Sequence, residues 1–157
     1  MTVSTITCRL ATADDAATIH RFIYELAEYE KGEQHVMSTP EILRKQMLSD
    51  VPPFECLIAE RNGEPCGFAL FFQSYSTWEA KAGLYLEDLY VTPVGRKFGV
   101  GRTLFGELHK IAQARGYARI DWKVLDWNKP ARDFYDRIGA EAQSDWIPYR
   151  LIVNSPS

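Results

Sequence analysis

Residues 84–108 decide the fold, and they read LYLEDLYVTPVGRKFGVGRTLFGEL. Residues 84–91 are apolar on both faces apart from Glu87 and Asp88, which is typical of a strand inside a covered sheet. A basic, glycine-rich turn follows, and beyond it apolar residues recur at helical spacing. A strand, a glycine turn and a helix N-terminus together predict an anion site, because backbone N–H groups and the helix dipole favour negative charge there.

Two common phosphate-binding loops do not fit this turn. The Walker loop requires Gly, four residues and then Gly-Lys-Ser or Gly-Lys-Thr, and no window of the stretch supplies it. The dinucleotide pattern also fails, because the next glycine after Gly101 is Gly106. The pattern that remains is Arg-x-x-Gly-x-Gly, residues 96–101. By itself this pattern favours a tight turn with an exposed basic edge over a phosphate loop, so the rest of the chain must decide.

Size and composition set limits on the class of protein. The chain has 157 residues, of which 46% are hydrophobic and 13% aromatic. These values predict one globular domain over residues 1–157, with residues 154–157 as a loose tail. The net charge of −3 argues against a nucleic-acid binder, whose surface is usually strongly basic.

The cysteines, the apolar runs and the histidines indicate the cellular compartment, whether the chain spans a membrane and whether it binds a metal. The three cysteines show no metal or redox spacing, which is typical of buried thiols in a reducing compartment. No apolar run reaches membrane-spanning length, and Arg9 interrupts the N-terminal region where a signal peptide would need its apolar core. The three histidines lack ligand spacing. We expect a cytoplasmic protein with no metal and no membrane partner.

Periodicity and turn signals predict the order of elements. The strands are expected at residues 6–10, 55–60, 66–74, 84–91, 118–125 and 146–153. The helices are expected from residue 12 onward, from Thr39 to before residue 51, over residues 99–115, and over a short segment that ends at Gly139. Because a helix separates residues 84–91 from residues 118–125, these two strands should be parallel neighbours. The order predicts an α/β (α+β) fold, a central mixed β-sheet with helices on both faces.

Two separated motifs resemble one family. The loop at residues 96–101 is similar to the acyl-CoA loop of the GCN5-related N-acetyltransferases (GNAT), and residues 128–140 (NKPARDFYDRIGA) resemble the family's late segment, N-x-x-A-x-x-F/L-Y-x-x-x-G-A. Residues 25–30, 75–78 and 85–88 resemble the diamine acetyltransferase branch, which includes spermidine/spermine and thialysine N-acetyltransferases. Tyr-Ser-Thr-Trp at residues 75–78 leans toward the thialysine member. Lys97 departs from the branch, which usually has Gly there.

The resemblance implies acetyl-CoA as cosubstrate and a homodimer. It implies that loop amides hold the pyrophosphate and that the preceding strand pairs with the pantetheine arm. The cofactor-binding residues expected from it are Leu89, Tyr90, Val91, Arg96, Lys97, Phe98, Gly99, Val100, Gly101, Arg102, Asn128, Lys129, Pro130 and Ala131.

Acetyl transfer to an amine requires a proton acceptor and a proton donor. A free alkyl ammonium has a pKa near ~10.4, so a carboxylate must take its proton before attack at neutral pH. Glu87 is the candidate acceptor, with Asp88 as a substrate-binding or structural partner. Strict strand alternation sends these two side chains to opposite faces. Tyr135 resembles the family's general acid, since a phenol stays protonated at neutral pH and can protonate a thiolate.

The substrate side of the site is expected to be acidic and aromatic, as suits an alkyl ammonium. The candidate substrate-binding residues are Tyr29, Glu30, Trp78, Glu87, Asp88, Asp121, Trp122 and Lys123. A charge run is often only a solvated face, so the acids near residue 30 carry less weight by themselves.

The sequence therefore predicts an acetyl-CoA-dependent N-acetyltransferase of a small primary amine: a thialysine-like amino acid, a diamine or a polyamine. Direct attack in a ternary complex is preferred to a covalent route. Two alternatives stay open, a protein or peptide N-acetyltransferase of the same fold and a non-catalytic acyl-CoA-binding module.

Overall fold

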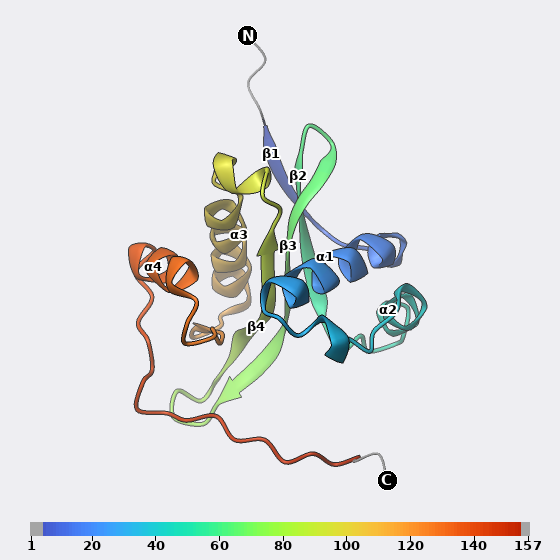
Figure 1. Ribbon diagram of the computed structural model, residues 1–157. Helices are drawn as coiled ribbons and strands as arrows, with labels where there is room; N and C mark the ends of the chain where they lie inside the picture. The colour runs from blue at the N-terminus through green and yellow to red at the C-terminus, as the bar shows by residue number, and fades with distance from the viewer. Residues whose placement is uncertain (1–4, 155–157) are drawn as a thin grey trace. The chain divides into compact units, whose positions relative to one another are not determined.

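The computed structural model describes residues 5–154. The chain divides into two compact units, one that extends to Lys123 and one that starts at Val124. The first unit is built on a sheet with the strand order β1-β2-β3-β4-β5 (Figure 1). The strands are β1 (Ile6–Leu10), β2 (Glu55–Arg61), β3 (Glu64–Ser76), β4 (Lys81–Val91) and β5 (Ile120–Asp121). All neighbours are antiparallel except β4 and β5, which are parallel as predicted.

The helices of the first unit lie on both faces of this sheet. They are α1 (Ala16–Tyr29), α2 (Pro40–Met47) and α3 (Val100–Arg115), and short 3-10 turns lie at Ala13–Asp15, Glu33–His35 and Gly95–Phe98. Local signals explain their starts: Thr39 caps α2 by accepting a hydrogen bond from the N–H of Ile42, with Pro40 as first residue. The α3 helix ends at Gly116, which adopts a φ of 70°.

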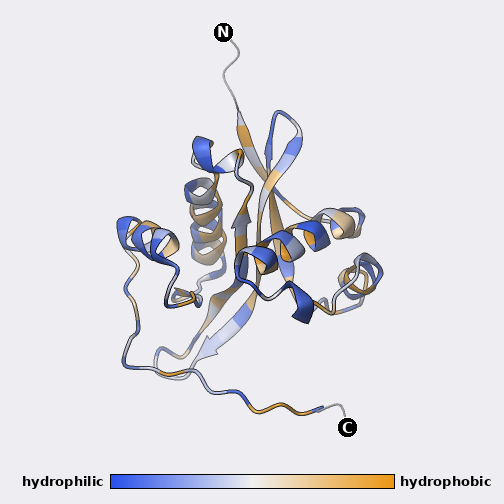
Figure 2. Cartoon of the chain, viewed as in Figure 1, coloured by the Kyte–Doolittle hydropathy of each residue, from blue (hydrophilic) through white to orange (hydrophobic). Residues whose placement is uncertain are grey.

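Two neighbouring residues of β3, Gly67 and Phe68, face helices on opposite sides of the sheet. Phe68 is fully buried beneath α1, where its ring lies 5.7 Å from the ring of Phe22. On the opposite face, a side chain at Gly67 would lie 3.1 Å from Val100 of α3, so the glycine permits α3 to approach the sheet closely. Figure 2 shows hydrophobic residues along the sheet and α3. The predicted mixed sheet with helices on both faces is confirmed.

The second unit is described by itself. Its helix, α4 (Lys129–Arg137), begins after Asn128, whose side-chain oxygen accepts a hydrogen bond of 3.3 Å from the N–H of Ala131. The predicted strand at residues 146–153 is wrong, because this segment has neither helix nor strand. An extended segment becomes a strand only when a neighbour pairs with its backbone, and Pro148 also removes one donor.

The predicted strand at residues 118–125 is also shorter in the structure. Only Ile120 and Asp121 pair with β4, opposite Leu84 and Tyr85. Beyond this point β4 contains a bulge, which bends a strand away from its neighbour. Within residues 5–154, no helix combines the length and apolar character needed to cross a membrane.

Candidate active site

A β-bulge at Glu87 shapes the centre of β4. In the pairing of β3 with β4, Leu70 lies opposite Asp88 and Phe71 lies opposite Leu86, so Glu87 has no opposite residue. A bulge of this kind sets two residues of one strand against one of the other and interrupts the alternation of side chains. It is the feature of the sheet that residue spacing alone does not predict.

The bulge places Tyr85 and Asp88 on the same face of the sheet. Tyr85 pairs with Phe72, and their rings lie 5.1 Å apart. Asp88 pairs with Leu70. Leu70 and Phe72 are two residues apart in β3, so both side chains lie on the same face of the sheet. The α1 helix covers this face. Glu87 acts electrostatically on both Tyr85 and Asp88. The prediction that Glu87 and Asp88 lie on opposite sides assumed an unbroken strand, and the register shift at Glu87 interrupts that alternation.

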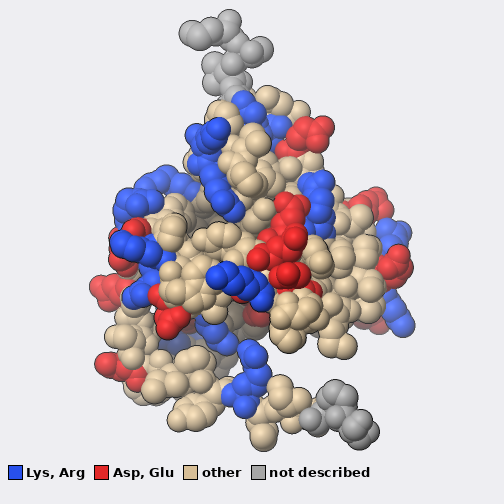
Figure 3. Space-filling view, viewed as in Figure 1, with Lys and Arg blue, Asp and Glu red and all other residues tan. Residues whose placement is uncertain are grey.

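Two carboxylates, Glu87 and Glu30, act electrostatically on a third, Asp88. Burial of its carboxylate, and then the charges of Glu87 and Glu30, raise the pKa of Asp88 to about 6. Glu30 follows the last residue of α1, and partial burial raises its pKa too. In Figure 3, acidic side chains gather in the middle of the view, over the region where α1 crosses the sheet. A site of this kind suits a cation, which would relieve the repulsion among the carboxylates.

The free edge of β4 begins next to these carboxylates. The N–H of Thr92 donates to the carbonyl of Cys66 at 2.9 Å. Hydrogen-bonded and non-bonded pairs alternate in antiparallel sheets, so Leu89 and Val91 turn their N–H and C=O groups away from β3. The β5 strand pairs only with Leu84 and Tyr85, so this edge lies beyond the end of β5. Leu89 and Val91 can thus pair with an extended ligand, whereas the backbone of Tyr90 pairs with β3.

The turn after β4 leads into the N-terminus of α3. Gly99 precedes α3 with a φ of 69°, a conformation that strains other residues. The carbonyl of Gly99 accepts hydrogen bonds from the N–H and the hydroxyl of Thr103, each at 3.1 Å. Gly99 offers no side chain to cap α3, so the first-turn N–H groups, at Val100, Gly101 and Arg102, have no capping side chain. These groups can receive a phosphate, as the sequence predicted.

Arg96 is exposed, and its side chain forms three interactions with the end of β4 and the end of α1. Its Nε donates a hydrogen bond of 3.0 Å to the carbonyl of Val91. Its guanidinium lies 5.8 Å from the ring centre of Tyr29 and 5.9 Å from that of Tyr90. Arg96 thus joins the turn, the end of β4 and the end of α1.

The other side chains of the turn lie at the surface. Lys97 and Arg102 are exposed, where positive charge can meet a phosphate. Phe98 is 40% exposed and lies beneath the guanidinium of Arg61, which is 3.7 Å from the ring centre.

In the second unit, the predicted cofactor residues surround the start of α4. Asn128 is buried and caps the helix, with Pro130 in the first turn. Lys129 binds Asp133 at 2.8 Å, so its charge is already paired within the helix. Tyr135 is half-buried, and its ring centre lies 5.9 Å from that of Phe134.

The predicted substrate residues separate into two groups. Glu30 and Glu87 act electrostatically on Asp88, and Tyr29 adjoins Glu30 at the end of α1. Trp78 lies elsewhere, in the β3–β4 hairpin turn with 86% of its surface exposed. The β4 strand separates this turn from Asp88 by about 20 Å at the usual rise of a strand.

The remaining predicted substrate residues come from β5 and the residues after it. Asp121 receives a hydrogen bond of 2.9 Å from Arg119 and acts on the phenol of Tyr85. Trp122 packs against Phe105 of α3, with ring centres 5.0 Å apart, and Lys123 is exposed.

Tyr85 gains importance that sequence reasoning did not assign to it, and Tyr90, expected only as a cofactor residue, gains a contact with α1. Tyr85 is half-buried, and burial, then Glu87 and Asp121, raise the pKa of its phenol. Tyr90 donates a hydrogen bond of 3.0 Å to Glu25 of α1. Tyr85 was already part of the motif at residues 85–88, but only the bulge reveals that it shares a face with Asp88.

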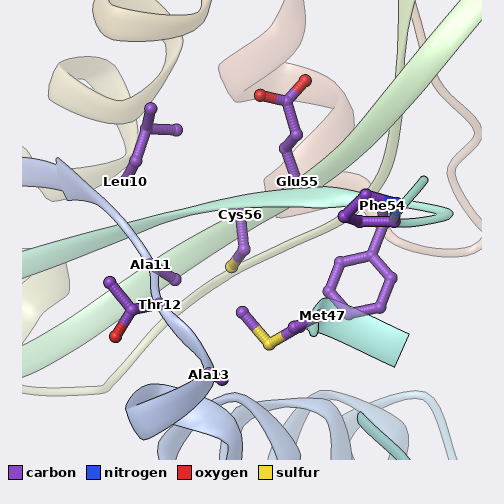
Figure 4. Close-up of a pocket in the computed structure, with 9 residues that line it drawn as sticks. Leu10, Ala11, Thr12, Ala13, Met47, Phe54, Glu55 and Cys56 are labelled. Carbon is purple, nitrogen blue, oxygen red and sulfur yellow. The ribbon is translucent and has the colours of Figure 1, made fainter. Parts of the chain in front are cut away.

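A cavity of about 170 Å³ lies apart from these residues, beside β1, α2 and the start of β2 (Figure 4). Met47 and Cys56 point toward it, and its lining is mostly apolar. Cys56 lies opposite Leu70, so the cavity begins two strands away from Asp88. It contains none of the predicted site residues. Among residues 5–154, no cluster of three or more His, Cys, Asp or Glu side chains could hold a metal ion.

Comparison with known proteins identifies the family. The model of the Acetyltransferase (GNAT) family matches residues 19–140. The thialysine N-epsilon-acetyltransferase of Caenorhabditis elegans is 39% identical over 144 residues, which cover 89% of this chain and 88% of that protein. The human spermidine/spermine N(1)-acetyltransferase-like protein 1 is 32% identical, over 91% of this chain and 22% of that longer protein.

The fold agrees with this result. The aminoglycoside N-acetyltransferase AAC(6')-Iy, solved in complex with CoA, superposes with a TM-score of 0.73 at 17% identity, covering 96% of this chain and 97% of that one. The chain therefore belongs to the GNAT family of acetyltransferases, and it is an N-acetyltransferase that acts on amines.

Proposed function

We propose that this enzyme transfers the acetyl group of acetyl-CoA to a primary amine of a small cationic substrate, a thialysine-like amino acid, a diamine or a polyamine. The observation that carries the proposal is the bulge at Glu87. It groups Glu87 and Asp88 with Glu30 directly beside the free backbone edge of β4, which continues into the Gly99 turn. A cation site thus adjoins an acyl-CoA site. The C. elegans relative, named for thialysine, supports the same class of amine.

Acetyl-CoA fits the residues present, and it supplies an activated thioester. The outward N–H and C=O groups of Leu89 and the outward N–H of Val91 would pair with the pantetheine arm. The first-turn N–H groups of α3 would hold the pyrophosphate, with Lys97 and Arg102 as neighbouring positive charges. The N–H of Leu89 would polarise the thioester carbonyl, as a preorganised donor does in other acyl-transfer sites.

Two side chains would handle the protons. Glu87, directly or through a water molecule, accepts a proton from the ammonium, and the neutral nitrogen then attacks the acetyl carbon. As the C–S bond breaks, Tyr135 donates its phenolic proton to the departing sulfur. As the amide forms, the attacking nitrogen loses a second proton, which restores the phenol of Tyr135, so the net products are the acetylated amine, the CoA thiol and the one proton taken up by Glu87.

The cysteines support direct transfer over a covalent route. Burial is the main cause that raises the pKa of Cys8 to about 11, and burial raises the pKa of Cys56 and Cys66 as well. Such thiols stay protonated and are poor nucleophiles at neutral pH. All three are free, which suits the reducing cytoplasm as the compartment.

We propose that both units act as one acetyltransferase domain. The family match over residues 19–140 spans the boundary after Lys123, so Glu87 and Tyr135 belong to the same family region.

We also propose a homodimer. The C-terminal segment carries large apolar side chains that are 61–94% exposed: Ile147, Tyr149, Leu151, Ile152 and Val153. Exposed apolar runs of this length usually mark an interaction surface, and a second copy is the partner that the predicted strand character of the segment suits. Sedimentation of the wild type should give a dimer and that of Leu151→Asp a monomer; a monomeric wild type would refute this assembly.

A free-thiol release assay tests the main proposal. Purified enzyme and acetyl-CoA are incubated with thialysine, lysine, spermidine, spermine, putrescine or a lysine peptide. Saturable release with the free amines is expected, and release with the peptide alone would favour a protein acetyltransferase instead. No release with any amine, despite binding of CoA, would favour an acyl-CoA-binding module.

A further inference from the structure

The side chain of Arg96 does not extend from the turn in the manner of Lys97. Its Nε donates to the carbonyl of Val91 at 3.0 Å, and its guanidinium contacts the rings of Tyr29 and Tyr90 at 5.8 and 5.9 Å. The three partners come from the end of β4 and the end of α1. Arg96 is therefore the side chain that joins the cofactor turn to both neighbouring elements.

The carbonyl of Val91 lies at the free edge of β4 and does not bond to β3. Because Thr92 bonds to Cys66, the backbone of Val91 faces the free edge of β4. The Nε–H group of Arg96 donates a hydrogen bond to this outward carbonyl. The bond fixes the last peptide groups of β4 at the point where an extended ligand would pair with Leu89 and Val91.

The aromatic contacts hold the same guanidinium from the α1 side. Tyr90 also donates to Glu25 of α1 at 3.0 Å, and Glu25 lies 3.5 Å from Arg21. Arg96 is thus the last member of a connected set of side chains that ties α1 to β4. A planar guanidinium can donate in its plane and contact rings with its faces, which a lysine cannot do.

We propose that Arg96 is a positioning residue that aligns the end of β4 for the acyl-pantetheine arm, rather than a counter-charge for the pyrophosphate. The inference rests on the proposed use of acetyl-CoA. It differs from the expectation drawn from the Arg-x-x-Gly-x-Gly pattern, in which this arginine supplies charge beside the phosphates. Arg96, Lys97 and Arg102 are all exposed, and Lys97 and Arg102, which make none of the contacts of Arg96, remain for that role.

A donor without phosphates separates the two roles. Initial rates are measured for acetyl-CoA and for S-acetylpantetheine, which keeps the thioester and the arm but lacks the pyrophosphate. The variants are Arg96→Met, Arg96→Lys and, as the matched loss of one positive charge in the same turn, Lys97→Met. Arg96→Met should raise KM about tenfold for both donors, the loss expected for one charge-assisted hydrogen bond.

The two further variants should change KM for the two donors in different ways. Lys97→Met should raise KM only for acetyl-CoA. Arg96→Lys, which keeps the charge, should resemble Arg96→Met with both donors. A general loss of folded protein would lower kcat and leave KM unchanged, and circular dichroism at the assay temperature measures that fraction.

The proposal is overturned if Arg96→Met affects acetyl-CoA alone, if Arg96→Lys behaves as the wild type, or if KM is unchanged for both donors. If the wild type releases no thiol from either donor, the proposed function fails, and hydrogen exchange then decides the role of Arg96. Faster exchange at the amides of residues 89–99 in Arg96→Met than in Lys97→Met would support positioning, and equal exchange would refute it.

Discussion

The hydroxyl of Tyr90 donates a hydrogen bond of 3.0 Å to Oε1 of Glu25, which ties the middle of α1 to the end of β4. The ring of Tyr90 also lies 5.8 Å from that of Phe22, in the core between helix and sheet. Burial, and then its bond to Glu25, raise the pKa of Tyr90 to about 12. The substrate side and the cofactor side of the proposed site are therefore fixed to each other through one tyrosine.

Replacing Tyr90 by Phe should lower the free energy of unfolding by about 1 kcal/mol, because a part-buried hydrogen bond is lost while the ring stays in place. Urea denaturation measures the change. Tyr75→Phe is the control, since Tyr75 is 65% exposed, and it should have no measurable effect. Equal stabilities of Tyr90→Phe and wild type would show that the bond contributes nothing.

Replacing Asp88 by Asn should stabilise the fold at neutral and alkaline pH. Burial, then Glu87 and Glu30, raise the pKa of Asp88 to about 6, above the value of ~3.9 expected in the unfolded chain. The folded state therefore holds this proton more tightly, and stability falls as pH rises through about 6. The gain from Asp88→Asn should be of order 2 kcal/mol near pH ~8 and should shrink toward pH ~4.

Unfolding free energies at several pH values test this dependence. Asp14→Asn is a suitable control, because the Asp14 side chain is 90% exposed and should give a small change at every pH. A gain for Asp88→Asn that is the same at acid and alkaline pH would contradict the assignment of the raised pKa to Asp88.

Alanine at Gly99 should weaken cofactor binding, whereas alanine at Gly116 should not. Both glycines have a φ near 70°, and a Cβ at either would meet open space, so each substitution costs about 1–2 kcal/mol of backbone strain alone. Only Gly99 precedes the amides proposed to hold the pyrophosphate. Calorimetric titration with CoA should show weaker binding for Gly99→Ala and near-normal binding for Gly116→Ala. Similar affinities in the two variants would argue against a phosphate site at this turn.

Replacing Tyr135 by Phe should lower kcat by about 10²-fold, because the departing thiolate loses its proton donor. The loss should be smallest with a donor whose thiol is more acidic than that of CoA, since such a thiolate needs less help. Tyr24→Phe, at a position that is 42% exposed, serves as the control. An unchanged kcat for Tyr135→Phe across the pH range would exclude Tyr135 as general acid.

Local sequence predicted most of the framework for identifiable reasons. Thr39 followed by Pro40 marks the start of α2, and Asn62-Gly63, a dipeptide typical of hairpin turns, joins β2 to β3 with positive φ at both residues. Val100, Leu104 and Leu108 recur at helical spacing and are fully buried on α3. These signals depend on backbone preferences and periodicity within a few residues, which the sequence contains directly.

The errors arose where a distant segment decides the outcome. The apolar residues at 146–153 have strand character, but the strand needs a partner that the described chain does not pair with it. Tyr85 and Asp88 share a face only because β3 leaves Glu87 without an opposite residue. Neither the missing partner nor the bulge has a signal within the segment itself.

By itself, the sequence determined the strand, the glycine turn and the helix start at residues 84–108, together with the family that they indicate. It did so because turn chemistry, apolar periodicity and motif spacing are local properties. Tertiary structure alone decided that Glu30 of the α1 end acts on Asp88, and that Arg96 donates a hydrogen bond to the carbonyl of Val91. Burial, pairing register and side-chain direction depend on which distant segments pack together, and those contacts exist only in the folded chain.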